Sequence, residues 1–111
     1  YFSKAIKLKP DYIVATNKLA NGYYLPGDYL NSIKQYQKSL LVESDNPETH
    51  TKLGTVLEES GKLDEAKRRH EQALRINPKN ISAYNRLGLF YEKIDQYQAA
   101  IKQYKKILVL V

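Results

Sequence analysis

The segment Tyr84-Asn85-Arg86-Leu87-Gly88-Leu89-Phe90-Tyr91 decides the fold of this chain, because two earlier segments share its pattern. Residues 50–57 read His-Thr-Lys-Leu-Gly-Thr-Val-Leu, and residues 16–23 read Thr-Asn-Lys-Leu-Ala-Asn-Gly-Tyr. A leucine followed by a small residue recurs at the same place in all three segments, with a spacing of 34 residues. A constant period of this length indicates supersecondary units that stack on one another, since one unit alone cannot bury its apolar face.

The period divides the chain into four parts. Residues 1–12 are interpreted as the tail of an incomplete unit, and residues 13–46, 47–80 and 81–111 as three units. The third unit stops short of its closing proline position. Because the chain opens with Tyr1 in the middle of the pattern, we expect it to be part of a longer protein.

Each unit reads as two helices, because its apolar residues recur at steps of three and four. The turns within the units are predicted at Pro26-Gly27-Asp28, Ser60-Gly61-Lys62 and Ile94-Asp95-Gln96. In the first two turns, glycine can adopt the backbone conformation that ends a helix.

The helix ends between units carry their own signals. Proline at Lys9-Pro10 and Asn77-Pro78 is expected to end a helix, since it cannot continue one. Asn46 is a suitable N-cap for a helix whose first residue is Pro47. The sequence therefore predicts seven helices, at about residues 1–8, 12–25, 29–42, 47–59, 63–76, 81–93 and 97–110.

The repeated positions resemble the tetratricopeptide repeat family over nearly the whole chain. That family has a large residue, Leu, a small residue and an aromatic residue in its first helix, and here these are Tyr84, Leu87, Gly88 and Tyr91. The matching residues of the other units are His50, Leu53, Gly54 and Leu57, and Thr16, Leu19, Ala20 and Tyr23. In the second helices the matching residues are Ser32, Tyr36 and Ser39, then Ala66, His70 and Ala73, then Ala100, Tyr104 and Ile107. The incomplete unit supplies Phe2, Ala5 and Pro10.

The resemblance implies an all-α fold, in which antiparallel helix hairpins stack as a right-handed α-solenoid. Small residues let paired helices approach closely, so Gly88 and Ala100 are expected to face each other. His50 and His70 fall at positions that are usually aromatic in the core, and we interpret them as packed residues rather than metal ligands.

Composition excludes several classes of protein. The chain has no cysteine, so it forms no disulfide and no cysteine-based metal site, and a reducing compartment such as the cytoplasm is the default expectation. No apolar run approaches the length that crosses a membrane. The net charge of +6 is spread along the chain, with acids interleaved. Because the tyrosines belong mostly to the packing pattern, they are not free to stack on bases, which argues against nucleic acid binding.

Catalysis has no support in the sequence. Glu58 and Glu59 are adjacent, so we expect them to point to different sides of a helix. No nucleophile–base grouping stands out, and the five glycines have packing or turn explanations rather than forming a phosphate loop. No cofactor is expected.

The resemblance places the first helix of each hairpin along a concave groove, and this groove is the candidate binding site. Once the packed residues are assigned inward, the predicted groove residues are Asn17, Lys18, Asn21, Tyr24, Lys52, Thr55, Asn85, Arg86 and Leu89. Further polar residues expected to face the groove are Glu48, Thr51, Glu58, Glu59, Ser82, Glu92 and Lys93. Lys18, Lys52 and Arg86 are spaced 34 residues apart, so stacking is expected to set three cations in a row. Such a row suits an acidic peptide or a chain-terminal carboxylate, and a solvated polar face is the alternative.

Some members of the family hold chaperone C-termini through a clamp of Lys, Asn, Asn, Lys and Arg. The corresponding residues here are Asn17, Asn21, Lys52, Ser82 and Arg86. Only Asn21 and Arg86 agree with that clamp. The sequence therefore argues against chaperone binding of that kind.

The end of the chain is apolar, which suggests a further contact. Arrays normally end with a polar capping helix, yet Ile107, Leu108 and Val111 are predicted to be uncovered. Self-association through such uncapped ends is one possibility.

The predicted function is a non-catalytic scaffold that binds a peptide or helix of a partner protein in its groove. Two alternatives stay open. The array is either the targeting arm of a larger enzyme, such as a glycosyltransferase, or a self-assembling structural module.

Overall fold

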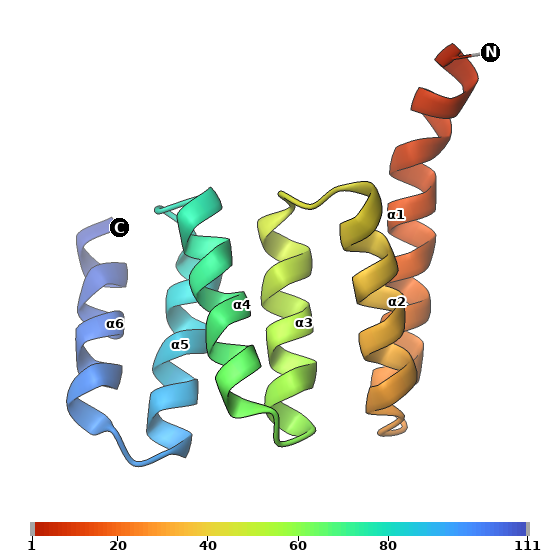
Figure 1. Ribbon diagram of the computed structural model, residues 1–111. Coiled ribbons are helices and arrows are strands. Elements are labelled where there is room, and N and C mark those ends of the chain that lie inside the picture. The colour runs from red at the N-terminus through yellow and green to blue at the C-terminus, as the bar shows by residue number, and fades with distance from the viewer. Residues whose placement is uncertain (1, 111) are drawn as a thin grey trace.

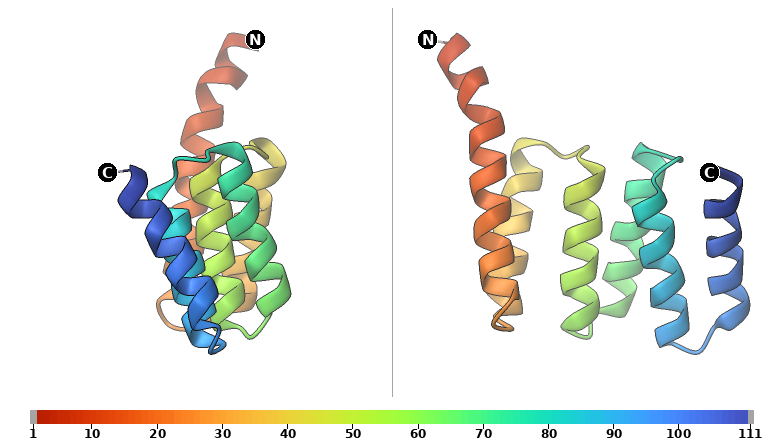
Figure 2. Two further views of the ribbon diagram at one scale, coloured as in Figure 1. Left: turned by 90° about the vertical axis from the view of Figure 1, so that its left-hand side faces the viewer. Right: turned by 180° about the vertical axis from the view of Figure 1, so that it is seen from behind.

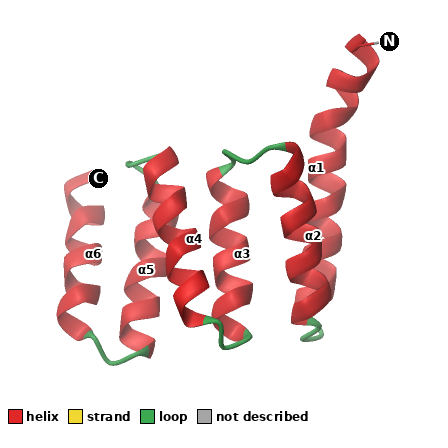
Figure 3. Ribbon diagram, in the orientation of Figure 1, coloured by secondary structure: helices red, strands yellow, loops and turns green. Residues whose placement is uncertain are grey.

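The computed structural model describes the backbone of residues 2–110 and the side chains of residues 12–110. Within these residues all regular structure is helical (Figure 3), and no helix combines the length and apolarity needed to cross a bilayer. The helices are α1 (Phe2–Tyr24), α2 (Tyr29–Val42), α3 (Pro47–Glu59), α4 (Leu63–Ile76), α5 (Ile81–Lys93) and α6 (Tyr97–Leu110). Helices α2 to α6 have the predicted bounds, so the all-α helix-hairpin fold is confirmed.

The start of the chain differs from the prediction. Residues 2–24 form the single helix α1, which continues through Pro10, so the described chain has six helices rather than seven. Proline loses one helical hydrogen bond and disfavours the preceding turn, but it does not by itself build a new hairpin. In Figures 1 and 2 the first turns of α1 extend beyond the other helices, where no second hairpin lies to hold a chain reversal. The side chains of Phe2, Ala5 and Pro10 lie outside the described ones.

The turns and caps follow the local sequence signals. The backbone takes positive φ at Gly27 (90°) and Gly61 (87°), as expected for glycines that end a helix. Asp95 takes the same role in the third turn with φ of 61°. The Asn46 side chain accepts hydrogen bonds from the backbone amides of Glu48 (3.0 Å) and Thr49 (3.2 Å), which caps α3.

The helices form two layers of an elongated α-solenoid, 52 × 31 × 19 Å in extent. Successive helices pair as three hairpins, α1 with α2, α3 with α4, and α5 with α6. Neighbouring hairpins meet where α2 packs on α3, α4 on α5, and α3 on α5. The views in Figures 1 and 2 place α1, α3 and α5 in one layer and α2, α4 and α6 in the other.

Small residues bring the paired helices together. In the first hairpin both Ser32 and Ala20 are fully buried, and the Ser32 hydroxyl donates a hydrogen bond of 2.8 Å to the Ala20 carbonyl. At Gly88 the nearest atoms to the place a Cβ would occupy belong to the Tyr104 ring, at 2.5 Å, rather than to Ala100. The Tyr104 ring at Gly88 and the His70 ring at Gly54 therefore fill the space that a side chain would occupy.

Leu19 departs from the repeat pattern. Leu53 is fully buried and Leu87 is 3% exposed, but Leu19 is 48% exposed. Helices α3 and α5 are each covered by the preceding hairpin as well as by their own partner, whereas no hairpin precedes α1 among the described helices. Leucine at this repeat position is therefore buried on α3 and α5 but exposed on α1, where no preceding hairpin covers it.

The exposed end of α6 agrees in part with the sequence prediction. Leu108 and Val109 are 76% and 85% exposed, while Ile107 is half-buried. Val111 lies outside the described residues. Apolar side chains thus face solvent on the last described helix.

Candidate peptide-binding groove

The layer formed by α1, α3 and α5 contains the larger of two described cavities, with a volume of about 530 Å³. Five of the predicted groove residues line it: Asn21, Tyr24, Lys52, Thr55 and Arg86. The lining also includes Glu48, Thr51 and Ser82, which the sequence places on the same face. Successive first helices therefore bring residues from all three predicted units to one concave site.

A smaller cavity of about 370 Å³ adjoins the first, because Thr55 and Arg86 line both. Leu89 is the third predicted groove residue in this cavity. Its other lining residues are the charged side chains Glu58, Glu59, Glu92 and Lys93. The smaller cavity therefore has a more acidic lining than the larger one.

Three predicted groove residues line neither cavity: Asn17, Lys18 and Asn85. The Asn17 amide donates a hydrogen bond of 3.2 Å to the Thr49 hydroxyl, so it joins α1 to α3. Lys18 and Asn85 are exposed. They share repeat positions with Lys52 and Thr51, which line the larger cavity, so their place along the array rather than their helical phase separates them from it.

The two cations of the larger cavity differ in their surroundings. The Lys52 ammonium lies 3.1 Å from the Glu48 carboxylate, one turn earlier on α3. Within residues 12–110, the Arg86 guanidinium forms no hydrogen bond or ion pair, and it lines both cavities. Arg86 is therefore the cation with its full hydrogen-bonding capacity available for a ligand.

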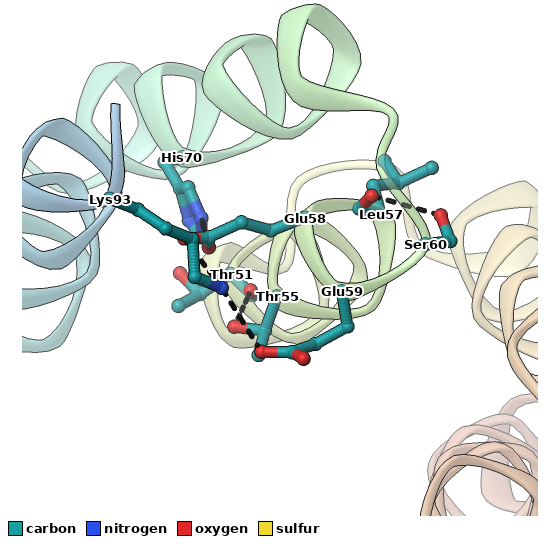
Figure 4. A network of polar contacts seen from close by, with 8 residues as sticks. All are labelled: Thr51, Thr55, Leu57, Glu58, Glu59, Ser60, His70 and Lys93. Carbon is teal, nitrogen blue, oxygen red and sulfur yellow. Dashed lines mark hydrogen bonds and ion pairs between the residues drawn. The ribbon is translucent and has the colours of Figure 1, made fainter. Parts of the chain in front are cut away.

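A polar network at the smaller cavity joins α3, α4 and α5 (Figure 4). The Lys93 ammonium lies 3.6 Å from Glu58 and 3.3 Å from Glu59. Lys93 thus reaches both carboxylates, although the Glu58 side chain is 6% exposed beside His70 and the Glu59 side chain is 40% exposed. Burial acts to lower the pKa of Lys93, but the carboxylates of Glu59 and Glu58 outweigh it, so the pKa is raised.

Both histidines are buried between helices. Fully buried His70 lies 3.6 Å from the Glu58 carboxylate, and its ring fills the space above Gly54. The His50 ring contacts the backbone carbonyl of Ser44 at 2.7 Å and the Arg69 guanidinium at 3.5 Å. Both histidines are therefore packed side chains that contact neighbouring segments of the chain.

Sequence reasoning missed Tyr36, Val56 and Asn80, which also line the larger cavity. Tyr36 belongs to α2 in the opposite layer, and the repeat pattern assigns it to the core. It is only 2% exposed, yet it forms part of the cavity floor. Asn80 caps α5, because its side chain accepts a hydrogen bond of 3.1 Å from the Ala83 amide. An asparagine directly before a helix is the signal by which the sequence could have revealed it.

Stacked helix hairpins with an open inner layer define a helical repeat array. A family model described as tetratricopeptide repeat matches residues 11–79, and a second with the same description matches residues 71–102. The chain belongs to the tetratricopeptide repeat family.

Two curated relatives are DnaJ homolog subfamily C member 7 of Homo sapiens and the photosystem I assembly protein Ycf3 of a strain of Prochlorococcus marinus. The first is 26% identical over 96% of this chain and 25% of its own length. The second is 33% identical over 79% of this chain and 56% of its own length. The chain thus spans a quarter and about half of these relatives.

Among solved structures, the chain resembles the second TPR domain of Spaghetti (RPAP3), which was solved with the HSP90 peptide SRMEEVD. The TM-score is 0.80 at 17% identity, and the match covers 95% of this chain and 99% of that domain. This likeness shows that the two share a fold.

Proposed function

We propose that this chain is a non-catalytic protein-interaction module, and that its groove binds an extended peptide segment of a partner protein. The observation that carries the proposal is the cavity of about 530 Å³ on the inner layer, with polar side chains around a partly apolar floor. Clefts of this size with a few convergent polar groups are the usual form of a binding site.

The lining favours an acidic peptide. Lys52 and Arg86 give the larger cavity a net positive charge against the single carboxylate of Glu48. Asn21, Ser82 and Thr55 add groups that can hydrogen-bond an extended backbone. Charge-assisted hydrogen bonds from arginine to a carboxylate are among the stronger contacts in protein recognition.

The related proteins support a role in holding other proteins. The name of Ycf3 describes an assembly protein, and the second TPR domain of Spaghetti holds a peptide. The chaperone clamp of the family is poorly kept here, because only Asn21 and Arg86 match it. We therefore propose an acidic peptide other than a chaperone tail as the ligand.

A structural role in self-assembly is a second candidate. It is favoured by the exposure of Leu108 (76%) and Val109 (85%) on α6. Contact between copies at this end would bury apolar surface that α6 leaves open.

A peptide-binding experiment tests the groove proposal. A rhodamine-labelled pool of acidic heptapeptides would be titrated against the protein and against a Lys52→Glu, Arg86→Glu variant. The matched control is Lys34→Glu, Lys38→Glu, which makes the same charge change at exposed positions of α2 that line neither cavity. Anisotropy should fall to background for the groove variant and stay near the original for the control. Equal binding by both variants would refute the groove as the site.

A further inference from the structure

The side chains at one repeat position of the second helices point toward one repeat position of the first helices. Tyr36, His70 and Tyr104 are spaced 34 residues apart on α2, α4 and α6. Their counterparts Tyr24, Glu58 and Glu92, with the same spacing, lie near the ends of α1, α3 and α5. The three hairpins can therefore be compared pair by pair.

In two hairpins this pair includes a carboxylate. The Tyr104 hydroxyl donates a hydrogen bond of 3.1 Å to the Glu92 carboxylate. In the second hairpin, the His70 ring lies 3.6 Å from the Glu58 carboxylate. The polar group of the second helix thus faces an acid supplied by the chain itself.

The first hairpin lacks that acid, because Tyr24 stands where the other units have glutamate. Within residues 12–110, no hydrogen bond is formed by the Tyr36 hydroxyl. Only 2% of the side chain is exposed, and it lines the larger cavity. Because Tyr36 lines the cavity and its hydroxyl has no acceptor in the described chain, the hydroxyl is available to donate a hydrogen bond to a ligand there.

We propose that the Tyr36 hydroxyl and the Arg86 guanidinium together hold a carboxylate of the partner peptide in the larger cavity. This inference rests on the proposed function and names the chemical group that the groove selects. The ligand's carboxylate accepts from the Tyr36 hydroxyl as Glu92 accepts from the Tyr104 hydroxyl in the third hairpin.

The charges around the cavity fit this ligand. Arg86 has no ion pair within the described side chains, whereas Lys52 neutralises Glu48 at 3.1 Å. Burial raises the pKa of the Tyr36 hydroxyl, and Tyr24 and Glu48 add to the shift, so the group stays a protonated donor at neutral pH.

Tyr36→Phe isolates the hydroxyl, because it keeps the ring that packs in the core. Tyr104→Phe is the matched control, since it removes a hydroxyl at the same repeat position but lines neither cavity. Tyr36→Phe should leave the melting temperature unchanged, because its hydroxyl has no partner in the described chain. A folded variant then reports on binding alone.

The probes are three rhodamine-labelled heptapeptide pools with uncharged variable positions. One has a central Glu and an amidated C-terminus, one has a central Gln and a free C-terminus, and one has a central Gln and an amidated C-terminus. The first two separate a side-chain carboxylate from a chain-terminal one, and the third has no carboxylate. Dissociation constants would be measured by fluorescence anisotropy for the original protein and both tyrosine variants.

We expect one carboxylate pool to bind at least roughly tenfold more tightly than the pool without a carboxylate. Tyr36→Phe should lose most of that preference, and Tyr104→Phe should keep it. A preference unchanged by Tyr36→Phe would overturn the role of Tyr36. Equal binding of all pools, abolished by Lys52→Glu, Arg86→Glu, would overturn the carboxylate site while the groove proposal stands. Binding of no pool would contradict both.

Discussion

At the scale of single residues, two glycines in the helix hairpins pack directly against aromatic rings of the facing helix. A Cβ at Gly54 would meet the His70 ring at 2.7 Å, and His70 is fully buried, so its ring has no solvent to move into. A Cβ at Gly88 would meet the Tyr104 ring at 2.5 Å, but Tyr104 is only half-buried on the outermost helix. The two glycines therefore differ in how far the facing ring can yield.

Gly54→Ala should destabilise the fold by about 1–3 kcal/mol, because an overpacked core must shift its side chains. Gly88→Ala should cost less, since Tyr104 can turn outward. Gly22→Ala is the control: nothing lies within 4 Å of its Cβ position, and alanine favours a helix by about 1 kcal/mol. Urea unfolding followed by circular dichroism would measure all three, and a Gly54→Ala variant as stable as Gly22→Ala would refute the proposed packing.

Side chains near the groove show where sequence reasoning stops. The residue pattern predicted Asn21, Tyr24 and Arg86 at the cavity, because helical periodicity fixes which face they share. It could not predict Tyr36 there, since the ring is core and the residue reaches the cavity from the other layer. It also could not foresee that Asn17 bonds to Thr49, because that contact depends on the distance between α1 and α3.

At the scale of helices, the hairpins are joined by packing and by the ion pairs of Lys93 with Glu58 and Glu59. Local signals set most helix bounds, as the caps at Asn46 and Asn80 show. Pro10 was misjudged because a chain reversal needs a second hairpin to hold it, and local sequence does not contain that information. The repeat thus fixes the helices, and neighbouring hairpins decide which surfaces are covered.

Lys93→Gln should lower stability modestly at neutral pH, because it removes the cation between two carboxylates. The folded-state pKa of Lys93 lies above its ordinary value of 10.5, so its contribution is fully present below that pH. The contribution disappears as pH rises through the folded-state pKa. The stability gap between the two proteins should therefore be constant from pH 7 to about 10 and then close.

Urea unfolding across this pH range would measure the gap, with Lys102→Gln as the control. Lys102 is an exposed lysine of α6 with no ion pair in the described chain. A gap that stays open above the lysine titration range would show that Lys93 acts by packing rather than by charge.

At the scale of the whole molecule, the array exposes apolar side chains at both described edges. Leu19 is 48% exposed on α1, and Leu108 and Val109 are more exposed still on α6. A preceding hairpin buries the repeat position of Leu19, as at Leu53, whereas Leu41, at the repeat position of Val109, is 87% exposed even though α2 packs on α3. Whether copies associate through α6 is therefore a question for measurement in solution.

Leu108→Glu, Val109→Glu should leave the melting temperature nearly unchanged, because the two side chains are 76% and 85% exposed. If copies associate through α6, sedimentation equilibrium should show concentration-dependent dimers for the original protein and a monomer for this variant. Identical sedimentation of the two proteins would contradict self-assembly at this end.

The central claim is that the inner layer of α1, α3 and α5 binds a peptide, and peptide titration of the ¹⁵N-labelled protein tests it most directly. The ligand is the heptapeptide pool with the highest affinity in the anisotropy measurements. We expect amide shifts to change around Tyr24, Thr55 and Arg86, while amides on the exposed faces of α2 and α4 stay in place. Changes confined to α2, α4 and α6 would contradict the claim.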